Sequence, residues 1–245
     1  MTSRKPAAAL YAALFAFAAL FAATAPPAQA LSLNQWSVSC GADRGAIRRE
    51  GKTWVFRTSS NLCKGGIFHQ RAELSTKKIA PSRKGTYQFV SHVSMTSPSR
   101  EKYGLFQIHD GRFGCSPPLK LDVMPDGHLQ FDSDYKIGTD PGSVPGVNCI
   151  KNTSLSTSRS KAVLRRDGTE YELAVTVSFD GKGGFGILVA VDSVTQLTGR
   201  YAYEPGRGFF KSKHFYFKHG VYSQHMFPYE MRSRDMTVTK LRTGG

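Results

Sequence analysis

The residues best suited to chemistry lie near the end of the chain, in the segment FYFKHGVYSQ at positions 215–224. Successive side chains of a β-strand point to opposite faces, so Lys218, Tyr222 and Gln224 share one face around Gly220. The glycine removes a side chain from the middle of this face, where a ligand or another backbone could come close. The segment therefore predicts a strand whose polar face receives a polar ligand. The opposite, largely apolar face carries Phe215, Phe217, His219 and Val221.

Two upstream segments repeat this pattern of an apolar face beneath a polar one. In FHQRAEL, His69, Arg71 and Glu73 share a face, and in YGLFQIHD the polar face carries Gln107 and His109. Each residue also has a purely structural interpretation, since Arg71 can simply pair with Glu73 and a strand histidine is more often structural than catalytic. The concurrence of three such strands favours one shared polar site.

These three segments resemble the signature segments of polysaccharide lyase family seven, the alginate lyases. The motifs are R-x-E-L from Arg71, Q-I-H from Gln107 and the long, specific Y-F-K-x-G-x-Y-x-Q from Tyr216, and they follow one another in the family's order. The resemblance implies a β-jelly roll, a concanavalin-like sandwich, whose concave sheet binds a uronate chain without metal or cofactor. It also implies a catalytic group of Arg71, Gln107, His109 and Tyr222, with Glu73, Lys218 and Gln224 binding substrate.

The chain departs from the family pattern at three positions. Ser75 stands where the family usually has a second arginine, His219 where it has a small residue, and Ser223 where it has asparagine. The loss of the arginine leaves the substrate open between alginate and another polyuronate such as glucuronan. In the family, isoleucine in Q-I-H accompanies action on guluronate-containing blocks, which Ile108 therefore favours.

The chemistry of β-elimination explains why these residue types belong together. A lyase removes the proton at C5 of a uronate, next to a carboxylate that opposes the formation of a carbanion. Arg71 and Gln107 can hydrogen-bond that carboxylate and stabilise an enolate-like transition state. Tyr222 suits the acid that protonates the O4 leaving oxygen, and it can also be the base if nearby cations lower its pKa. His109 is the alternative base when the C5 proton lies on the opposite face of the ring.

Three other classes of function compete with a lyase. A module that only binds anionic polysaccharide has no need of His109 and Tyr222 beside Arg71. A glycoside hydrolase requires two carboxylates across a cleft, whereas these faces offer only Glu73. A structural or membrane-surface role explains the charge of the chain but not the three patterned strands.

The elements that must position these residues read as short strands. Runs at 54–58, 87–95, 103–109, 119–124, 171–179, 187–191 and 236–241 are rich in β-formers, and convincing helix signals are missing. Turn signals at 125–127, 167–168 and 180–181 predict hairpins, and 152–160 reads as a loop. Many short strands with tight turns indicate an all-β sandwich or jelly roll in one domain, 31–245.

The N-terminal segment predicts export, and the charge of the chain predicts the kind of partner. Positively charged residues, an apolar run and Ala28-Gln29-Ala30 make residues 1–30 a signal peptide, so we expect a secreted or periplasmic protein without stable membrane insertion. Without Arg4 and Lys5, the 33 basic residues fall to 31 against 18 acidic ones, a net charge of about +13. This charge predicts a polyanionic partner, and export favours an anionic polysaccharide over nucleic acid. We expect the mature protein to be a monomer.

The four cysteines predict disulfides, because they are even in number and directed to an oxidising compartment. Four cysteines allow three pairings, and we favour the pairing of sequence neighbours. A metal site is disfavoured, since neither a C-x-x-C pair nor clustered histidines accompany them. The expected disulfides are Cys40–Cys63 and Cys115–Cys149.

Overall fold

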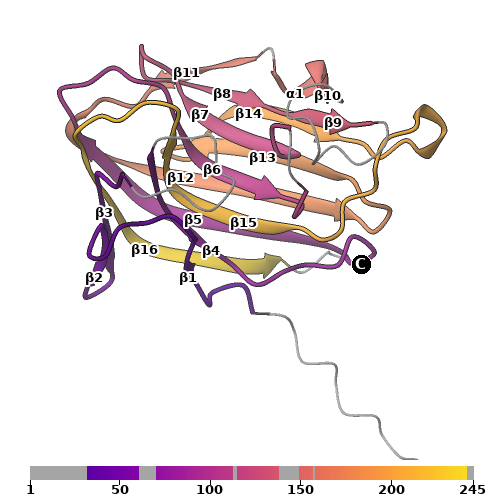
Figure 1. Cartoon of the computed structure of the whole chain (residues 1–245), viewed down its shortest axis with the longest axis horizontal. Helices are drawn as coiled ribbons and strands as arrows, with labels where there is room; N and C mark the ends of the chain where they lie inside the picture. Colours follow the sequence, from indigo (N-terminus) through magenta and orange to yellow (C-terminus); the bar gives the residue numbers. More distant parts are fainter. Residues whose placement is uncertain (1–31, 61–69, 113–114, 138–148, 157, 242–245) are drawn as a thin grey trace, which may run out of the picture. The chain divides into compact units, whose positions relative to one another are not determined.

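The computed structural model describes residues 32–60, 70–112, 115–137, 149–156 and 158–241, which belong to one compact unit that begins at Ser32. Nearly all regular structure in them is β, apart from the one-turn helix α1 (Thr153–Ser156) and the 3₁₀ turn η1 (Pro205–Arg207). The expected all-β class is confirmed. Two large antiparallel sheets stack as a sandwich (Figure 1).

The first sheet carries the segments singled out for chemistry. It contains seven strands among the described residues, and every neighbouring pair is antiparallel. In spatial order they are β1 (Ser37–Val38), β4 (Gln70–Ser75), β15 (Tyr216–Ser223), β6 (Tyr103–His109), β7 (Leu119–Val123), β8 (His128–Asp132) and β11 (Arg159–Val163).

The second sheet is built around the two longest strands, β5 and β12. In spatial order it contains β14 (Val194–Tyr201), β13 (Phe185–Val191), β12 (Asp167–Asp180), β5 (Lys84–Thr96), β16 (Glu230–Leu241), β3 (Thr53–Arg57) and β2 (Ile47–Glu50). A separate two-stranded ribbon joins β9 (Asp134–Lys136) to β10 (Cys149–Lys151). All pairs in both are antiparallel.

The core lies between the two large sheets and follows from strand alternation. On β12, Leu173, Val175 and Val177 are fully buried at every second position, as the sequence pattern predicts. Aromatic rings from both sheets meet in this layer, where the ring centroid of Phe106 lies 5.2 Å from Phe89 and 5.4 Å from Phe217. Each such side chain stabilises the fold by about 1.5–3 kcal/mol when fully buried.

Two of the three predicted hairpins are confirmed, and one is wrong. The turn at 125–127 joins the paired strands β7 and β8, and the turn at 180–181 joins β12 and β13. Asp167 and Gly168 instead begin β12 in the second sheet, whereas the preceding strand β11 pairs with β8 in the first. The turn signal is therefore a crossover between sheets. The predicted loop at 152–160 also holds α1 and the start of β11.

The Cys115–Cys149 disulfide is present, with its Cα atoms 5.7 Å apart. Cys40 is also disulfide-bonded, but its expected partner Cys63 lies outside the described residues. The expected signal peptide lies outside them as well. Within the part of the chain that the structure describes, no helix has the length and apolar character needed to span a membrane.

Candidate active site

The three segments with polar faces are neighbours in the first sheet, with β15 between β4 and β6. Along β15, Tyr222 stands opposite Arg71 of β4, and Lys218 stands opposite Gln107 of β6. Residues that are more than one hundred positions apart in the sequence therefore lie on one face, as the repeated pattern predicts. We call this surface, on β4, β15 and β6, the polar face.

Gly220 allows β4 to approach β15 closely. Its φ of +143° is unfavourable for other residues, and a Cβ atom there would lie 2.2 Å from the carbonyl oxygen of Ala72. The same atom would lie 2.7 Å from the Cα of Glu73. Of the two uses that the sequence suggested for this glycine, the structure shows the approach of another backbone.

A buried carboxylate organises the centre of the polar face. Glu73 is 1 % exposed, and its Oε2 lies 2.6 Å from Nζ of Lys218. Gln107 donates a hydrogen bond to its Oε1, and Nε of Arg71 lies 3.4 Å from Oε2. Burial lowers the pKa of Lys218, and the charge of Glu73 opposes this effect. Lys218 and Glu73, both expected to bind substrate, are thus 4 % exposed or less and paired with each other.

The ring of Tyr222 lies close to two of the cations in this cluster. The guanidinium carbon of Arg71 lies 4.5 Å from the ring centroid, and Nζ of Lys218 lies 5.6 Å from it. Burial raises the pKa of Tyr222 to about 12, opposed by Arg71 and reinforced by Glu73. The condition under which the sequence allowed Tyr222 to be the base, a pKa lowered by nearby cations, is therefore not met, because burial outweighs them. The hydroxyl is a phenol at neutral pH.

His109 lies at the other end of the face with a defined tautomer. Its ring stacks on Tyr216 with centroids 5.2 Å apart, and the Gly111 N–H donates to its Nδ1 at 3.0 Å. A neutral imidazole that accepts at Nδ1 carries its proton on Nε2. Burial lowers the pKa of His109, as do the charges of Lys218 and Lys136, so the ring is neutral. At neutral pH, Nε2 is a hydrogen-bond donor.

The remaining predicted residues lie away from this centre. Gln224 is exposed and follows the end of β15, and His69 lies outside the described residues. His219, a departure from the family pattern, is fully buried between the sheets, where it donates to the Leu105 carbonyl and accepts from Ser233. Sequence reasoning missed Tyr216 as part of the site, although the alternation that selects Lys218 also places Tyr216 on the polar face.

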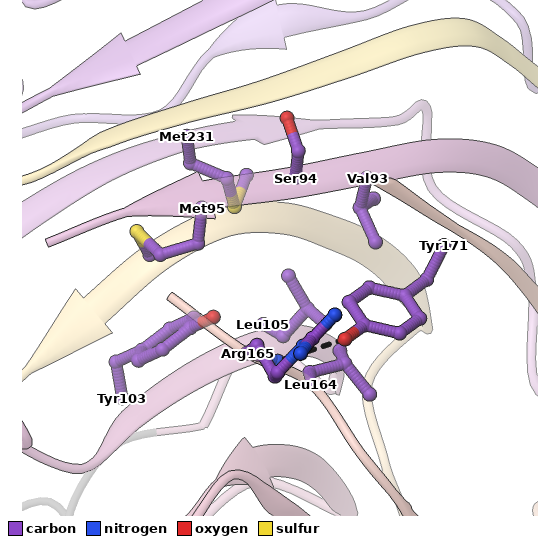
Figure 2. A pocket seen from close by; sticks show the side chains of 9 residues that line it. All are labelled: Val93, Ser94, Met95, Tyr103, Leu105, Leu164, Arg165, Tyr171 and Met231. Carbon is purple, nitrogen blue, oxygen red and sulfur yellow. Dashed lines mark hydrogen bonds between the residues drawn. The ribbon is translucent and has the colours of Figure 1, made fainter. Parts of the chain in front are cut away.

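The interior cavity shown in Figure 2 is separate from this face. Its volume is about 10 Å³, and it lies between the two sheets beside Met95, Tyr103 and Met231. It has room for about one water molecule and none for a sugar. The metal-ligand cluster found among the described residues is Cys115, Asp134 and Cys149, whose two sulfur atoms form the disulfide.

Comparison with known proteins finds the same fold in alginate lyases. No family model matches the sequence, and no curated protein matches it significantly. Alginate lyase A1-II′ of polysaccharide lyase family 7 is similar over 86 % of this chain and 96 % of its own, with a TM-score of 0.59 and 14 % identity. Alginate lyase PA1167 from Pseudomonas aeruginosa is similar over 86 % of this chain and 100 % of its own, with a TM-score of 0.53 and 13 % identity.

A third structure, the alginate lyase from Corynebacterium sp., is similar over 82 % of this chain and 83 % of its own, with a TM-score of 0.51 and 16 % identity. At these identities the comparison establishes the fold. The jelly roll implied by the family resemblance is confirmed.

Proposed function

We propose that this protein is a polysaccharide lyase that cleaves alginate, or a closely related polyuronate, by β-elimination. The observation that carries the proposal is the register of β4, β15 and β6, which gathers Arg71, Tyr222 and Gln107 on one face. The fold shared with family 7 alginate lyases supports it, and A1-II′ has been solved in complex with the substrate GGMG. An anionic polysaccharide also suits the net charge of the chain.

In the proposed mechanism, the substrate carboxylate is held by donors on the polar face. The side chain of Arg71 is 15 % exposed, so its guanidinium is partly accessible to a uronate carboxylate. The Gln107 side chain is 2 % exposed and its amide holds Glu73, so we assign it to the support of Arg71, whereas the partly exposed His109 offers Nε2–H. Such donors stabilise the charge that develops on the carboxylate as the C5 proton leaves, and each is worth about 10²–10³ in rate.

We assign both proton transfers to Tyr222. The lone pair of His109 is engaged by Gly111, and its lowered pKa makes it a weak base. With a pKa of about 12, the phenolate of Tyr222 is scarce but strong, and Arg71 stabilises it. The phenolate accepts the C5 proton, and the electron pair of the C5–H bond forms the C4–C5 double bond. The C4–O4 bond breaks, and its electron pair goes to O4. The phenol then protonates O4, which restores the phenolate.

Lys218 and Glu73 act beneath the substrate in this proposal. Their ion pair is almost completely buried, so we assign them the support of Arg71 and Gln107 rather than direct contact. Gln224 is exposed beyond β15 and remains a candidate for contact with a longer chain. The preference for guluronate-containing blocks rests on the family resemblance, since Ile108 itself is fully buried in the core.

The decisive experiment incubates the purified mature protein with alginate, glucuronan and hyaluronan. A lyase produces 4,5-unsaturated uronate ends, whose ultraviolet absorbance grows with time, and we expect the fastest growth with alginate. Oligoguluronate and oligomannuronate then test the block preference. New reducing ends without absorbance would indicate a hydrolase, and binding without cleavage would indicate a carbohydrate-binding module.

We also propose that the chain is exported before it acts. The signal-like residues 1–30 and the Cys115–Cys149 disulfide, which suits an oxidising compartment, support this location. Mass spectrometry of the secreted or periplasmic protein should find a mature N-terminus near residue 31. An intact N-terminus in the cytosolic fraction would contradict export.

A further inference from the structure

The tight turn that follows β6 determines how His109 is presented. Gly111 has a φ of +73°, and its N–H points back to Nδ1 of His109 at 3.0 Å. The same turn is closed by the Arg112 N–H, which donates to Oδ1 of Asp110 at 3.0 Å. A shift of this turn would therefore remove the hydrogen bond that places the imidazole proton on Nε2.

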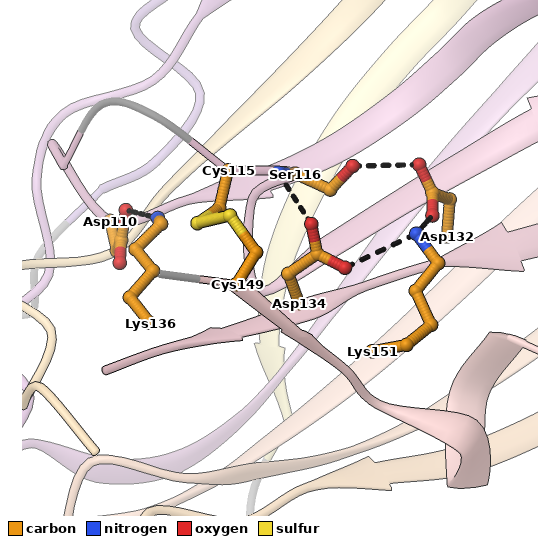
Figure 3. The surroundings of a disulfide bond; sticks show 8 residues. All are labelled: Asp110, Cys115, Ser116, Asp132, Asp134, Lys136, Cys149 and Lys151. Carbon is orange, nitrogen blue, oxygen red and sulfur yellow. Dashed lines mark hydrogen bonds and ion pairs between the residues drawn. A yellow bond between two sulfur atoms is a disulfide. The ribbon is translucent and has the colours of Figure 1, made fainter. Parts of the chain in front are cut away.

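A buried ion pair anchors the turn from below. Nζ of Lys136 lies 2.7 Å from Oδ1 of Asp110, and both side chains are 2 % exposed (Figure 3). The same carboxylate oxygen thus holds the turn and pairs with a cation from another strand. Removal of Lys136 would leave the Asp110 charge buried without its ammonium partner, which destabilises the arrangement that this carboxylate holds.

Lys136 is itself held rigidly. It stands opposite Cys149 in the ribbon of β9 and β10, and Cys149 is linked to Cys115 by the disulfide (Figure 3). The backbone carbonyl of Lys136 also accepts a hydrogen bond from the Phe210 N–H at 2.7 Å. The anchor of the turn is therefore fixed on both sides by contacts that do not involve the polar face.

The other side of the turn is covered by His214. A Cβ atom on Gly111 would lie 2.5 Å from Cε1 and Nε2 of the His214 ring, so the ring rests directly on the glycine. Arg112 continues the enclosure, because its Nε donates to the Lys211 carbonyl and its guanidinium carbon lies 4.9 Å from the Phe210 ring centroid. The turn is therefore enclosed between the segment 210–214 on one side and Lys136 on the other.

We propose that Asp110 and Lys136 are positioning residues that hold the turn after β6 and thereby keep the proton of neutral His109 on Nε2. Neither residue belongs to the motifs that carry the family resemblance. The consequence for catalysis rests on the proposed function, since it assumes that the Nε2–H of His109 donates to the substrate. The consequence for the tautomer of His109 does not depend on the proposed function.

The test compares Lys136→Met with a matched control, Lys120→Met. Lys120 is also buried at 7 % exposure and forms an ion pair with Asp132 at 2.8 Å, but it lies on β7, opposite Gln107 rather than at the turn. The ¹⁵N chemical shifts of the imidazole nitrogens distinguish the two neutral tautomers, and the His109→Gln variant assigns the signal. These spectra and the lyase kinetics are measured on the mature, disulfide-bonded protein.

For Lys136→Met we expect a mixture of tautomers and a kcat about 10–100-fold lower, with KM changed much less, because the substrate-binding cations remain. For Lys120→Met we expect the single Nε2–H tautomer, and its kcat does not serve as a control because Lys120 stands opposite Gln107 of the polar face. A Lys136→Met protein that keeps the single Nε2–H tautomer would overturn the proposal. Equal tautomer changes in both variants would also overturn it.

If Lys136→Met fails to fold, the Asp110→Asn/Lys136→Met double variant replaces it. This variant buries no unpaired charge and keeps an oxygen for the Arg112 N–H, but it lacks the anchor. The same mixture of tautomers is expected, and its absence counts against the proposal. A wild-type protein with the expected tautomer but no activity on polyuronates would instead refute the proposed function and leave the positioning intact.

Discussion

At the scale of single residues, the proposed chemistry depends on one hydroxyl group. Tyr222→Phe keeps the ring beside Arg71 and Lys218 and removes only the hydroxyl, so folding should be intact. Because the hydroxyl transfers both protons in the proposed mechanism, turnover should fall by about 10²–10⁴. Initial rates of absorbance increase and thermal melting measure the two effects. Tyr171→Phe, on β12 of the second sheet, is the control that also removes a tyrosine hydroxyl, and near-normal turnover in Tyr222→Phe would remove Tyr222 from the mechanism.

The pKa of Tyr222 gives a second prediction at this scale. The pKa of Tyr222 is about 12, so at lower pH values each increase of one pH unit raises the phenolate fraction about tenfold. The logarithm of kcat/KM should therefore rise with pH across the neutral and mildly alkaline range in which the protein stays folded. A neutral His109 acting as the base would give a plateau above neutral pH instead. The full pH profile of kcat/KM distinguishes the two assignments.

At the scale of the strands, the faces were predictable and the partners were not. The period of two is a property of every strand, so the sequence alone places Lys218 and Tyr222 opposite Phe217 and Val221, and the structure agrees. The ion pair of Lys218 with Glu73 joins residues 145 positions apart and depends on the register of β15 against β4, which no local pattern encodes.

Two further properties could not be predicted from the sequence because they also depend on how the strands pack. A turn signal such as Asp167-Gly168 indicates that the chain bends, but packing decides whether it returns to its own sheet or crosses to the other. Cationic residues near Tyr222 could lower its pKa, as the sequence suggests, but the raised pKa follows from burial, which only the folded structure reveals.

His219 on β15 yields a prediction about the stability of the sandwich. Burial lowers its pKa to about 3, whereas an unfolded histidine titrates near 6.5, so below pH 6.5 only the unfolded state takes up the proton. The free energy of unfolding should thus fall by about 1.4 kcal/mol per pH unit from about 6.5 towards 3 on account of this residue. The contribution is absent above that range.

Urea unfolding at pH 7 and pH 5 measures this effect, with His219→Gln as the comparison. Glutamine can still donate to the Leu105 carbonyl and accept from Ser233, but it does not titrate. The wild type should lose about 2 kcal/mol more than the variant between the two pH values. Equal losses would mean that His219 is protonated in the folded protein or is not buried as described.

At the scale of the whole molecule, cations gather at the His109 end of the polar face. Ile79 and Phe215 form an isolated bridge that brings the segment before β15 beside the segment after β4. Exposed lysines flank this bridge, and within the described part of the chain they form no ion pair within 4.0 Å. They are Lys77, Lys78, Lys211 and Lys213.

These lysines predict that substrate binding weakens as salt is added. A polyanion that is neutralised by lysines releases its condensed counterions, so its affinity falls as salt is added. For single-stranded nucleic acid, a plot of the logarithm of affinity against the logarithm of salt concentration has a slope of about −0.7 for each neutralised phosphate. Uronate charges are more widely spaced along their chain, so a smaller slope is expected here. The KM for alginate should rise with sodium chloride, and the double variant Lys211→Gln/Lys213→Gln should flatten that dependence.

The control is the double variant Lys84→Gln/Lys240→Gln, which removes two exposed lysines from the second sheet and should leave the salt dependence of KM unchanged. A KM that stays constant with salt, or equal effects of the two double variants, would show that the substrate does not bind along the lysines beside the polar face.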